Sequence, residues 1–224
     1  SKELNVSLKE INVKGLIKEK DVIEFYNSKN NSSKNKDSFI GKDFKKTIKL
    51  IGNTLEAKDL MISSKKHIPH SYIEKELNVT DLDSFLIKYR ETNGFMTLLA
   101  LIIKATGQSL LENEYFNSYR DKSRIMIYSN INIGIVIDID GKLSVPIIKD
   151  VPEKKIESIV KELLEMRKAL LQKNIDINNL LNGTFTISAL DHTSVNRFYP
   201  IIHPKQAAVL ALPSIFEKLN MNEK

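Results

Sequence analysis

The chain has 224 residues, of which 42% are hydrophobic and 28% charged, and its formal net charge is +6. That length suffices for one substantial hydrophobic core, and the composition is ordinary for a globular protein. The sequence contains no cysteine, which excludes disulfides, thiolate metal sites and cysteine nucleophiles. The lysines alternate with glutamates and form no basic stripe interleaved with aromatic residues, so we expect no binding of nucleic acid.

The first 41 residues divide into two parts by composition. Residues 1–26 show two short helical patterns separated by a Lys-Gly turn, which predicts a small helical module that is too short to be stable alone. Residues 27–41 are polar and rich in asparagine, serine and lysine, which is typical of a flexible linker. We therefore expect the main domain to occupy residues 42–224.

Helical patterns dominate the first half of the main domain. Residues 45–64 are predicted to be helical, with an interruption at Gly52, and Thr80 with Asp83 resembles a capping box at the start of another helix. Between them, residues 70–79 alternate like a half-buried strand. The apolar run 95–111 includes a lysine and a glutamine and falls short of the roughly 20 apolar residues of a membrane span, so we expect a buried helix and no membrane association. The polar N-terminus does not resemble a signal peptide.

Strand patterns dominate the second half. Residues 124–150 read as strands that are broken by a hairpin turn at Asp140 and Gly141. A helix with one apolar face follows Pro152, and GTFTISAL and KQAAVLALP read as two further strands. Because helices and strands mix without a regular βαβ rhythm, the sequence predicts an α+β domain, with helices flanking a mixed sheet.

Ser188, Asp191 and His192 stand close together in GTFTISALDHTSV, which raises the question of a Ser-His-Asp hydrolase. In such a triad the histidine contacts both the serine and the acid, whereas adjacent side chains on an extended chain point in different directions. The glycines of a nucleophile elbow are also missing around Ser188. We therefore do not interpret this stretch as a triad. The other histidines, at positions 67, 70 and 203, are weak evidence for a metal site, and we predict none.

Three longer stretches, in order along the chain, resemble one family. IPHSYIEKELNVTDLDSF, NINIGIVIDIDGKLSVPIIKD and NGTFTISALDHTSVNRFYPIIHPKQAAVLAL are similar to segments of the acyltransferase component of 2-oxoacid dehydrogenase complexes. Residues 1–26 look like part of that family's peripheral subunit-binding domain, with a shortened central loop. The resemblance implies a fold like that of chloramphenicol acetyltransferase, preceded by a small helical module.

The resemblance also implies a function, namely transfer of an acyl group between dihydrolipoamide and coenzyme A. The lipoyl group would be carried on a domain that these residues do not include. The implied partners are further copies of the chain, as a trimer or a larger core, and the dehydrogenase components of the complex. Ser188, the serine of TFTIS, matches the family's oxyanion donor, whereas the resemblance identifies no residues that bind coenzyme A. The implied location is the cytoplasm of a bacterium or the matrix of a eukaryotic organelle.

One family motif has no counterpart here. The family's general base lies in a D-H-R-x-x-D-G segment after the Q-A-A-I-L strand, and the residues that follow that strand in this chain contain no such segment. His192 belongs to a different loop, so we do not assign the base to it. Loss of a general base costs about 10²- to 10⁴-fold in rate, so we expect this chain alone to be a poor catalyst. Two hypotheses stay open, namely an acyltransferase and a non-catalytic core or docking subunit that keeps the fold for assembly.

Overall fold

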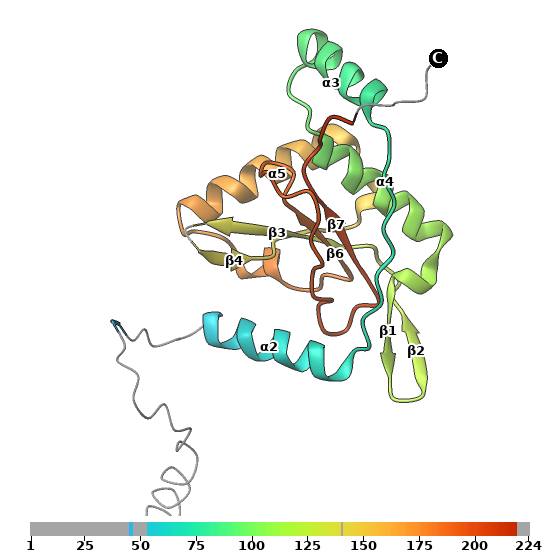
Figure 1. Ribbon diagram of the computed structural model, residues 1–224, viewed down its shortest axis with the longest axis vertical. Coiled ribbons are helices and arrows are strands. Elements are labelled where there is room, and N and C mark those ends of the chain that lie inside the picture. Colours follow the sequence, from blue (N-terminus) through green and yellow to red (C-terminus); the bar gives the residue numbers. More distant parts are fainter. Residues whose placement is uncertain (1–44, 47–52, 140, 219–224) are drawn as a thin grey trace, which may run out of the picture. The chain divides into compact units, whose positions relative to one another are not determined.

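A computed structural model of the chain describes residues 45–46, 53–139 and 141–218 (Figure 1). The predicted helical module 1–26 and linker 27–41 lie outside these residues. The helices are α2 (Asn53–His67), α3 (Thr80–Asn93), α4 (Leu98–Glu112) and α5 (Ile156–Leu171). The strands are β1 (Ser118–Asp121), β2 (Arg124–Ile127), β3 (Ile133–Ile139), β4 (Lys142–Ser144), β5 (Ile147–Ile148), β6 (Phe185–Ala189) and β7 (Val209–Leu212).

The main sheet is mixed, as the sequence predicts. Its strands follow the order β4-β3-β6-β7, and β5 also pairs with β3. The β3–β4 pair is antiparallel and confirms the predicted hairpin, in which Gly141 adopts a φ of 72°. In contrast, β6 runs parallel to both of its neighbours. The parallel step from β3 to β6 requires a crossover connection, and α5 provides it.

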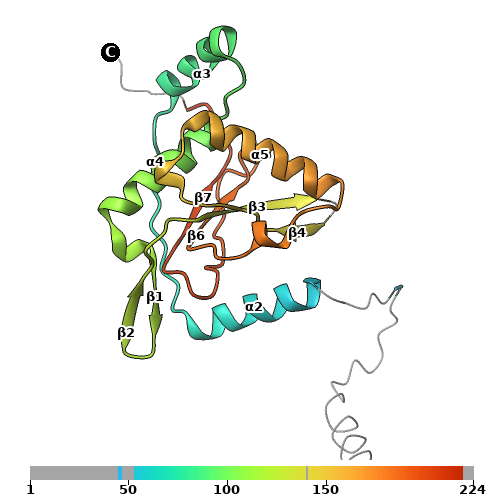
Figure 2. The ribbon, with the colours of Figure 1, turned by 180° about the vertical axis from the view of Figure 1, so that it is seen from behind.

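The hydrophobic core lies between one face of this sheet and the helices α4 and α5. Ile133 and Ile135 of β3 lie opposite Phe185 and Ile187 of β6, and all four side chains are buried. The helices add side chains that recur at helical spacing, namely Ala100, Ile103 and Leu110 of α4 and Ile159, Val160, Met166 and Leu170 of α5. In Figures 1 and 2, α4 and α5 lie on one side of the sheet and α2 lies on the other. The α+β layered fold is therefore confirmed.

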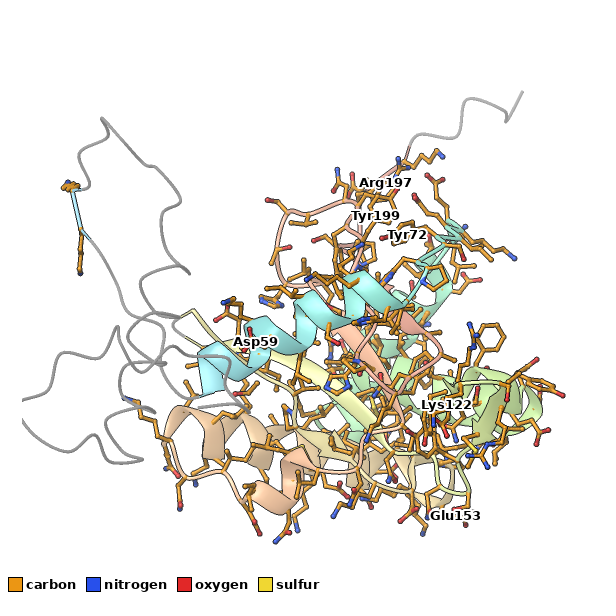
Figure 3. All side chains as sticks on the ribbon, turned by 90° about the horizontal axis from the view of Figure 1, so that it is seen from below. Asp59, Tyr72, Lys122, Glu153, Arg197 and Tyr199 are labelled. Atoms are coloured by element: carbon orange, nitrogen blue, oxygen red, sulfur yellow. The ribbon has the colours of Figure 1, made fainter. Side chains whose placement is uncertain are left out.

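Residues 68–79, which we call the strap, connect α2 to α3. The strap is extended, but it pairs with no strand in the described part of the chain, which differs from the predicted half-buried strand. Residues 71–78 are all exposed, so the predicted half-buried character is wrong, although side chains at alternate positions do make contacts on one face. Tyr72 packs against Tyr199 at a ring-centroid distance of 4.8 Å, Glu74 accepts a hydrogen bond from Arg197 at 2.8 Å, and Ile73 between them is 99% exposed. Figure 3 shows Tyr72, Tyr199 and Arg197 gathered in one corner.

The predicted capping box at the start of α3 is wrong. Thr80 is the first helical residue, and its predecessor Val79 makes no side-chain cap. Instead, the side-chain oxygen of Asn78 accepts hydrogen bonds from the backbone N–H of Thr80 at 3.0 Å and from its hydroxyl at 2.7 Å. Asparagine favours such local turns, so the strap ends in an Asn turn and not in a Thr-based cap.

Two elements extend from the body of the domain. The hairpin β1–β2 forms a sheet of its own and projects away from the main sheet, and α3 lies at the opposite end (Figure 1).

Within the described ranges, no single helix is long and apolar enough to cross a membrane, and α3 and α4 meet those criteria only as a pair bent by 109°.

Candidate functional site

Ser188 occupies the penultimate position of β6, in the interior of the main sheet. Its sheet partners are Val136 on β3 and Ala211 on β7. Because side chains alternate along a strand, Ser188 shares its face with Thr186, opposite to the core residues Phe185 and Ile187. The serine is only half-buried, whereas its neighbours Ile187 and Ala189 are buried. The strand thus holds a partly exposed hydroxyl on a backbone that is hydrogen-bonded on both sides.

The Ser188 face of β6 is polar but well satisfied. Thr186 donates its hydroxyl hydrogen to the side-chain carbonyl of Gln206 at 2.7 Å, and the Gln206 amide donates to the backbone carbonyl of Gly183 at 3.2 Å. Thr186 is 5% exposed and Gln206 6%, so this pair is buried. A buried polar pair of this kind favours the one packing in which both groups are hydrogen-bonded, because any other packing leaves a polar group buried without a partner and costs its full desolvation penalty. Gln206 therefore ties the segment before β7 to the strand that carries Ser188.

A local Ser-Asp-His site does not form. Asp191 and His192 contact each other, with 3.6 Å between the carboxylate oxygen and Nδ1, but the His192 side chain is 76% exposed. No hydrogen bond between Ser188 and either residue occurs in the described part of the chain. Their loop is organised in another way, because the Ser214 hydroxyl donates to the carbonyls of Leu190 and Thr193. This arrangement agrees with our interpretation that the stretch is not a triad.

The remaining histidines have structural partners. In His67, Nδ1 contacts the carbonyl of Ser63 at 2.8 Å, and in His203, Nδ1 contacts the carbonyl of Pro204 at 2.8 Å. Both ring nitrogens of His70 are engaged, one by the Ile68 carbonyl and the other by the Ile202 N–H. Among residues 53–139 and 141–218, no three His, Asp or Glu side chains are grouped to hold a metal ion.

Two ionisable groups near this region have shifted pKa values. The Lys218 ammonium, which is hydrogen-bonded to Glu76, lowers the pKa of that exposed carboxyl below its usual range. Burial, and to a lesser extent Tyr119, raises the pKa of Tyr128 above its usual range. The Tyr128 hydroxyl donates to the carbonyl of Lys205 at 2.9 Å, which fixes the turn just before Gln206.

Comparisons with known proteins identify the family of the chain. Residues 44–224 match the family described as 2-oxoacid dehydrogenases acyltransferase (catalytic domain). The chain belongs to this family. The match spans most of the chain and confirms the resemblance that the three sequence stretches indicate. It does not extend to the predicted helical module 1–26, which stays a prediction.

Relatives in two strains of Buchnera aphidicola are named dihydrolipoyllysine-residue acetyltransferase component of pyruvate dehydrogenase complex. The one from the Acyrthosiphon pisum subspecies is 32% identical over 98% of this chain and 55% of its own length. The one from the Schizaphis graminum subspecies is 31% identical over 100% of this chain and 60% of its own length. This acyltransferase-family chain therefore spans little more than half the length of these relatives.

Solved structures of the family share the fold. A probable dihydrolipoamide acetyltransferase from Listeria monocytogenes is 29% identical, with a TM-score of 0.75 over 79% of this chain and 78% of the other. The cubic core of a pyruvate dehydrogenase multienzyme complex superimposes with a TM-score of 0.77 at 21% identity, over 84% of this chain and 79% of the other. The chloramphenicol acetyltransferase-like fold predicted from the resemblance agrees with both.

Sequence reasoning missed the structural roles of three side chains, two at the Ser188 face of β6 and one on the strap. Thr186 could have been found from alternation, because it lies two residues before Ser188 and must share its face. Gln206 stands in the KQAAVLAL stretch used for the resemblance, but nothing in its spacing predicts a bond to Thr186. His70 was considered only as a metal ligand, and its contact with Ile202, 132 positions away, depends on the fold.

Proposed function

We propose that this chain is a dihydrolipoamide acyltransferase-type core component of a 2-oxoacid dehydrogenase complex, which transfers an acyl group between dihydrolipoamide and coenzyme A. The observation that carries the proposal is the family match over residues 44–224, which includes the strand TFTIS. Relatives named as acetyltransferase components of pyruvate dehydrogenase complexes, and one named as an acyltransferase component of a branched-chain complex, support it.

In the proposed reaction one thiol replaces another at a thioester carbonyl. The attacking thiol loses its proton and its sulfur bonds to the carbonyl carbon, while the π electrons move to the oxygen. When the resulting tetrahedral oxyanion collapses, the bond to the leaving sulfur breaks and the leaving thiolate takes up a proton. We assign to Ser188 the role of hydrogen-bond donor to this oxyanion. A donor of this kind contributes about 10²- to 10³-fold in rate.

The position of Ser188 supports this role. The residue is half-buried, and none of the side-chain hydrogen bonds of the described residues occupies its hydroxyl, which leaves the hydroxyl available to donate to a substrate oxygen. The strand cannot move without breaking its bonds to both β3 and β7. A donor that is fixed in advance needs no reorganisation when charge develops, which is the condition for effective electrostatic stabilisation.

A second function, a non-catalytic core or docking subunit, is favoured by a specific observation. Each of the four histidines in the sequence lies among the described residues: His67, His70 and His203 contact backbone groups, and His192 is exposed beside Asp191. A general base must reach the proton that it removes, so no histidine is assigned this role within one chain. In either function we propose a homo-oligomer, a trimer or a larger core, together with dehydrogenase components, in the bacterial cytoplasm or an organelle matrix.

An acyl-transfer assay distinguishes these functions, and its pH dependence shows whether a general base contributes. The assay follows coenzyme A-dependent acetylation of dihydrolipoamide by the full chain, from pH 6 to 9. With a working base the rate reaches a plateau below the thiol pKa, ordinarily about 8.5, whereas without a base it rises about tenfold per pH unit, as the thiolate does. If the folded, oligomeric chain gives no rate above the uncatalysed reaction at any pH, the acyltransferase proposal fails and the core-subunit function stands.

A further inference from the structure

Two side chains hold the backbone of Ile202 from opposite sides, and we call Ser64, His70 and Ile202 the clamp. The hydroxyl of Ser64, which is 2% exposed on α2, donates to the Ile202 carbonyl at 2.5 Å. The Ile202 N–H donates to Nε2 of His70 on the strap at 3.1 Å. Both backbone groups of one residue are therefore satisfied by side chains from a part of the sequence more than 130 positions earlier.

The clamp determines the tautomer of His70. Because Nε2 accepts a hydrogen bond from a backbone N–H, it cannot carry a proton. The other ring nitrogen, Nδ1, lies 2.8 Å from the carbonyl of Ile68, which has no hydrogen to donate, so Nδ1 carries the proton. Free neutral histidine favours the opposite tautomer, with hydrogen on Nε2. The geometry therefore predicts a specific and measurable state of this ring, set by its two partners.

The clamp leads to Ser188 through a short chain of hydrogen bonds. The residue after Ile202 is His203, whose carbonyl accepts the Gln206 N–H at 3.1 Å. The Gln206 side chain accepts the Thr186 hydroxyl at 2.7 Å, and Thr186 lies two residues before Ser188 on the same face of β6. A shift of Ile202 would thus be passed to the strand that carries the serine.

We propose that His70, in its Nδ1–H tautomer, is a positioning residue for the acyl-transfer site, because it anchors the segment from Ile202 to Gln206, which is hydrogen-bonded to the strand that carries Ser188. This inference rests on the proposed function of Ser188. His70 is assigned no contact with substrate, and it acts only through the backbone that it holds. Placement errors of about 1 Å at a reacting centre can cost up to about 10²-fold in rate, so loss of such an anchor has measurable consequences.

Three variants of the full chain test this role. His70→Leu removes the acceptor for the Ile202 N–H, His70→Gln keeps an acceptor on a side chain of similar reach, and His67→Leu is the matched control. His67 is the last residue of α2, three positions before His70, and among the described residues its Nδ1 is hydrogen-bonded to Ser63 of the same helix. We expect His70→Leu to lower kcat about 10- to 100-fold, with a change in KM below about twofold. His70→Gln restores kcat to within about threefold of wild type, and His67→Leu leaves it unchanged.

Spectroscopy tests the clamp without reference to activity. In chain labelled with ¹⁵N at its histidines, the resonances assigned by their loss in the His70→Leu variant must show a protonated Nδ1 and an unprotonated Nε2 at neutral pH. Hydrogen exchange at the Ile202 amide must be faster in His70→Leu than in wild type or His67→Leu. A protonated Nε2 in the wild-type chain would overturn the proposal, because the ring could not then accept the Ile202 N–H.

Kinetic failure of this proposal is distinguishable from failure of the proposed function. If the wild-type chain is active and His70→Leu keeps its kcat, the positioning role is wrong while the acyltransferase function stands. If the wild-type chain is inactive, the acyltransferase function fails and the positioning role fails with it, and the ring tautomer still shows whether the clamp exists.

Discussion

Replacing Thr186 by valine removes one hydroxyl group and leaves the shape of the side chain nearly unchanged. The wild-type hydroxyl donates at 2.7 Å to the side-chain carbonyl of Gln206, and the two residues are only 5% and 6% exposed. In the variant that carbonyl is buried without this donor, which costs about 1–3 kcal/mol. For a domain of this size each kcal/mol lowers Tm by about 2–4 °C, so we expect Tm to fall by about 2–12 °C.

Urea unfolding followed by circular dichroism measures this cost, with all variants at one protein concentration because assembly contributes to stability. The matched control is the double variant Thr186→Val with Gln206→Met, in which both bonding groups are removed. Gln206→Met alone loses two bonds, because the wild-type amide also donates to Gly183. The double variant should cost less than the sum of the single variants by about 0.5–3 kcal/mol. If the losses in unfolding free energy of the single variants simply add in the double variant, the hydrogen bond between Thr186 and Gln206 is refuted. A loss below about 0.5 kcal/mol for Thr186→Val would refute it as well.

Three further predictions concern stability and titration. Gly107→Ala adds a Cβ that would lie 2.6 Å from a Val151 side-chain carbon. The overpacking costs about 1–3 kcal/mol, which outweighs the gain in helix propensity of about 1 kcal/mol. Thermal unfolding should therefore show a lower Tm for this variant. Tyr128 has a raised pKa in the folded chain, so its contribution to stability is present below the ordinary tyrosine pKa of 10.0 and is lost as pH rises through the folded value. Tyr128→Phe should therefore lose less stability than wild type above about pH 10 in urea unfolding. Lys218→Ala should bring the lowered pKa of Glu76 back toward its ordinary value, as measured by NMR titration of the carboxyl carbon, and an unchanged pKa would show that the ion pair does not persist in solution.

Elements whose signals lie within a short window were predictable from the sequence. The strands β6 and β7, the hairpin around Gly141 and the helix α4 all stand where local patterns place them, although α4 buries one face and not its whole surface. Apolar periodicity and turn chemistry decide such elements because their partners recur at fixed local spacing. The position of Ser188 on a strand was predicted in the same way, and its proposed role comes from a family resemblance that leaves the role a prediction.

Long-range contacts were not predictable in this way. The strap alternates like a strand, yet in the described part of the chain its partners are side chains near residues 197–218 and not a neighbouring strand. At the start of α3, Thr80 and Asp83 have the spacing of a capping box, in which the acid accepts the Thr80 N–H. In the structure, the side-chain oxygen of Asn78 accepts that N–H instead. The contact between His70 and Ile202 joins positions 132 residues apart. The contacts of the strap and of His70 depend on tertiary packing, which local propensity does not encode. The Asn78 turn is instead a local hydrogen bond between residues two positions apart.

The central claim is that Ser188 stabilises the oxyanion of an acyl transfer between dihydrolipoamide and coenzyme A. The most direct measurement compares kcat for acetyl transfer by the wild-type full chain and by Ser188→Ala, with the fold and the oligomeric state of both checked beforehand. We predict that kcat falls about 10²- to 10³-fold with little change in KM, because the lost bond forms only in the transition state. An active wild-type chain whose kcat is unchanged in Ser188→Ala would contradict it.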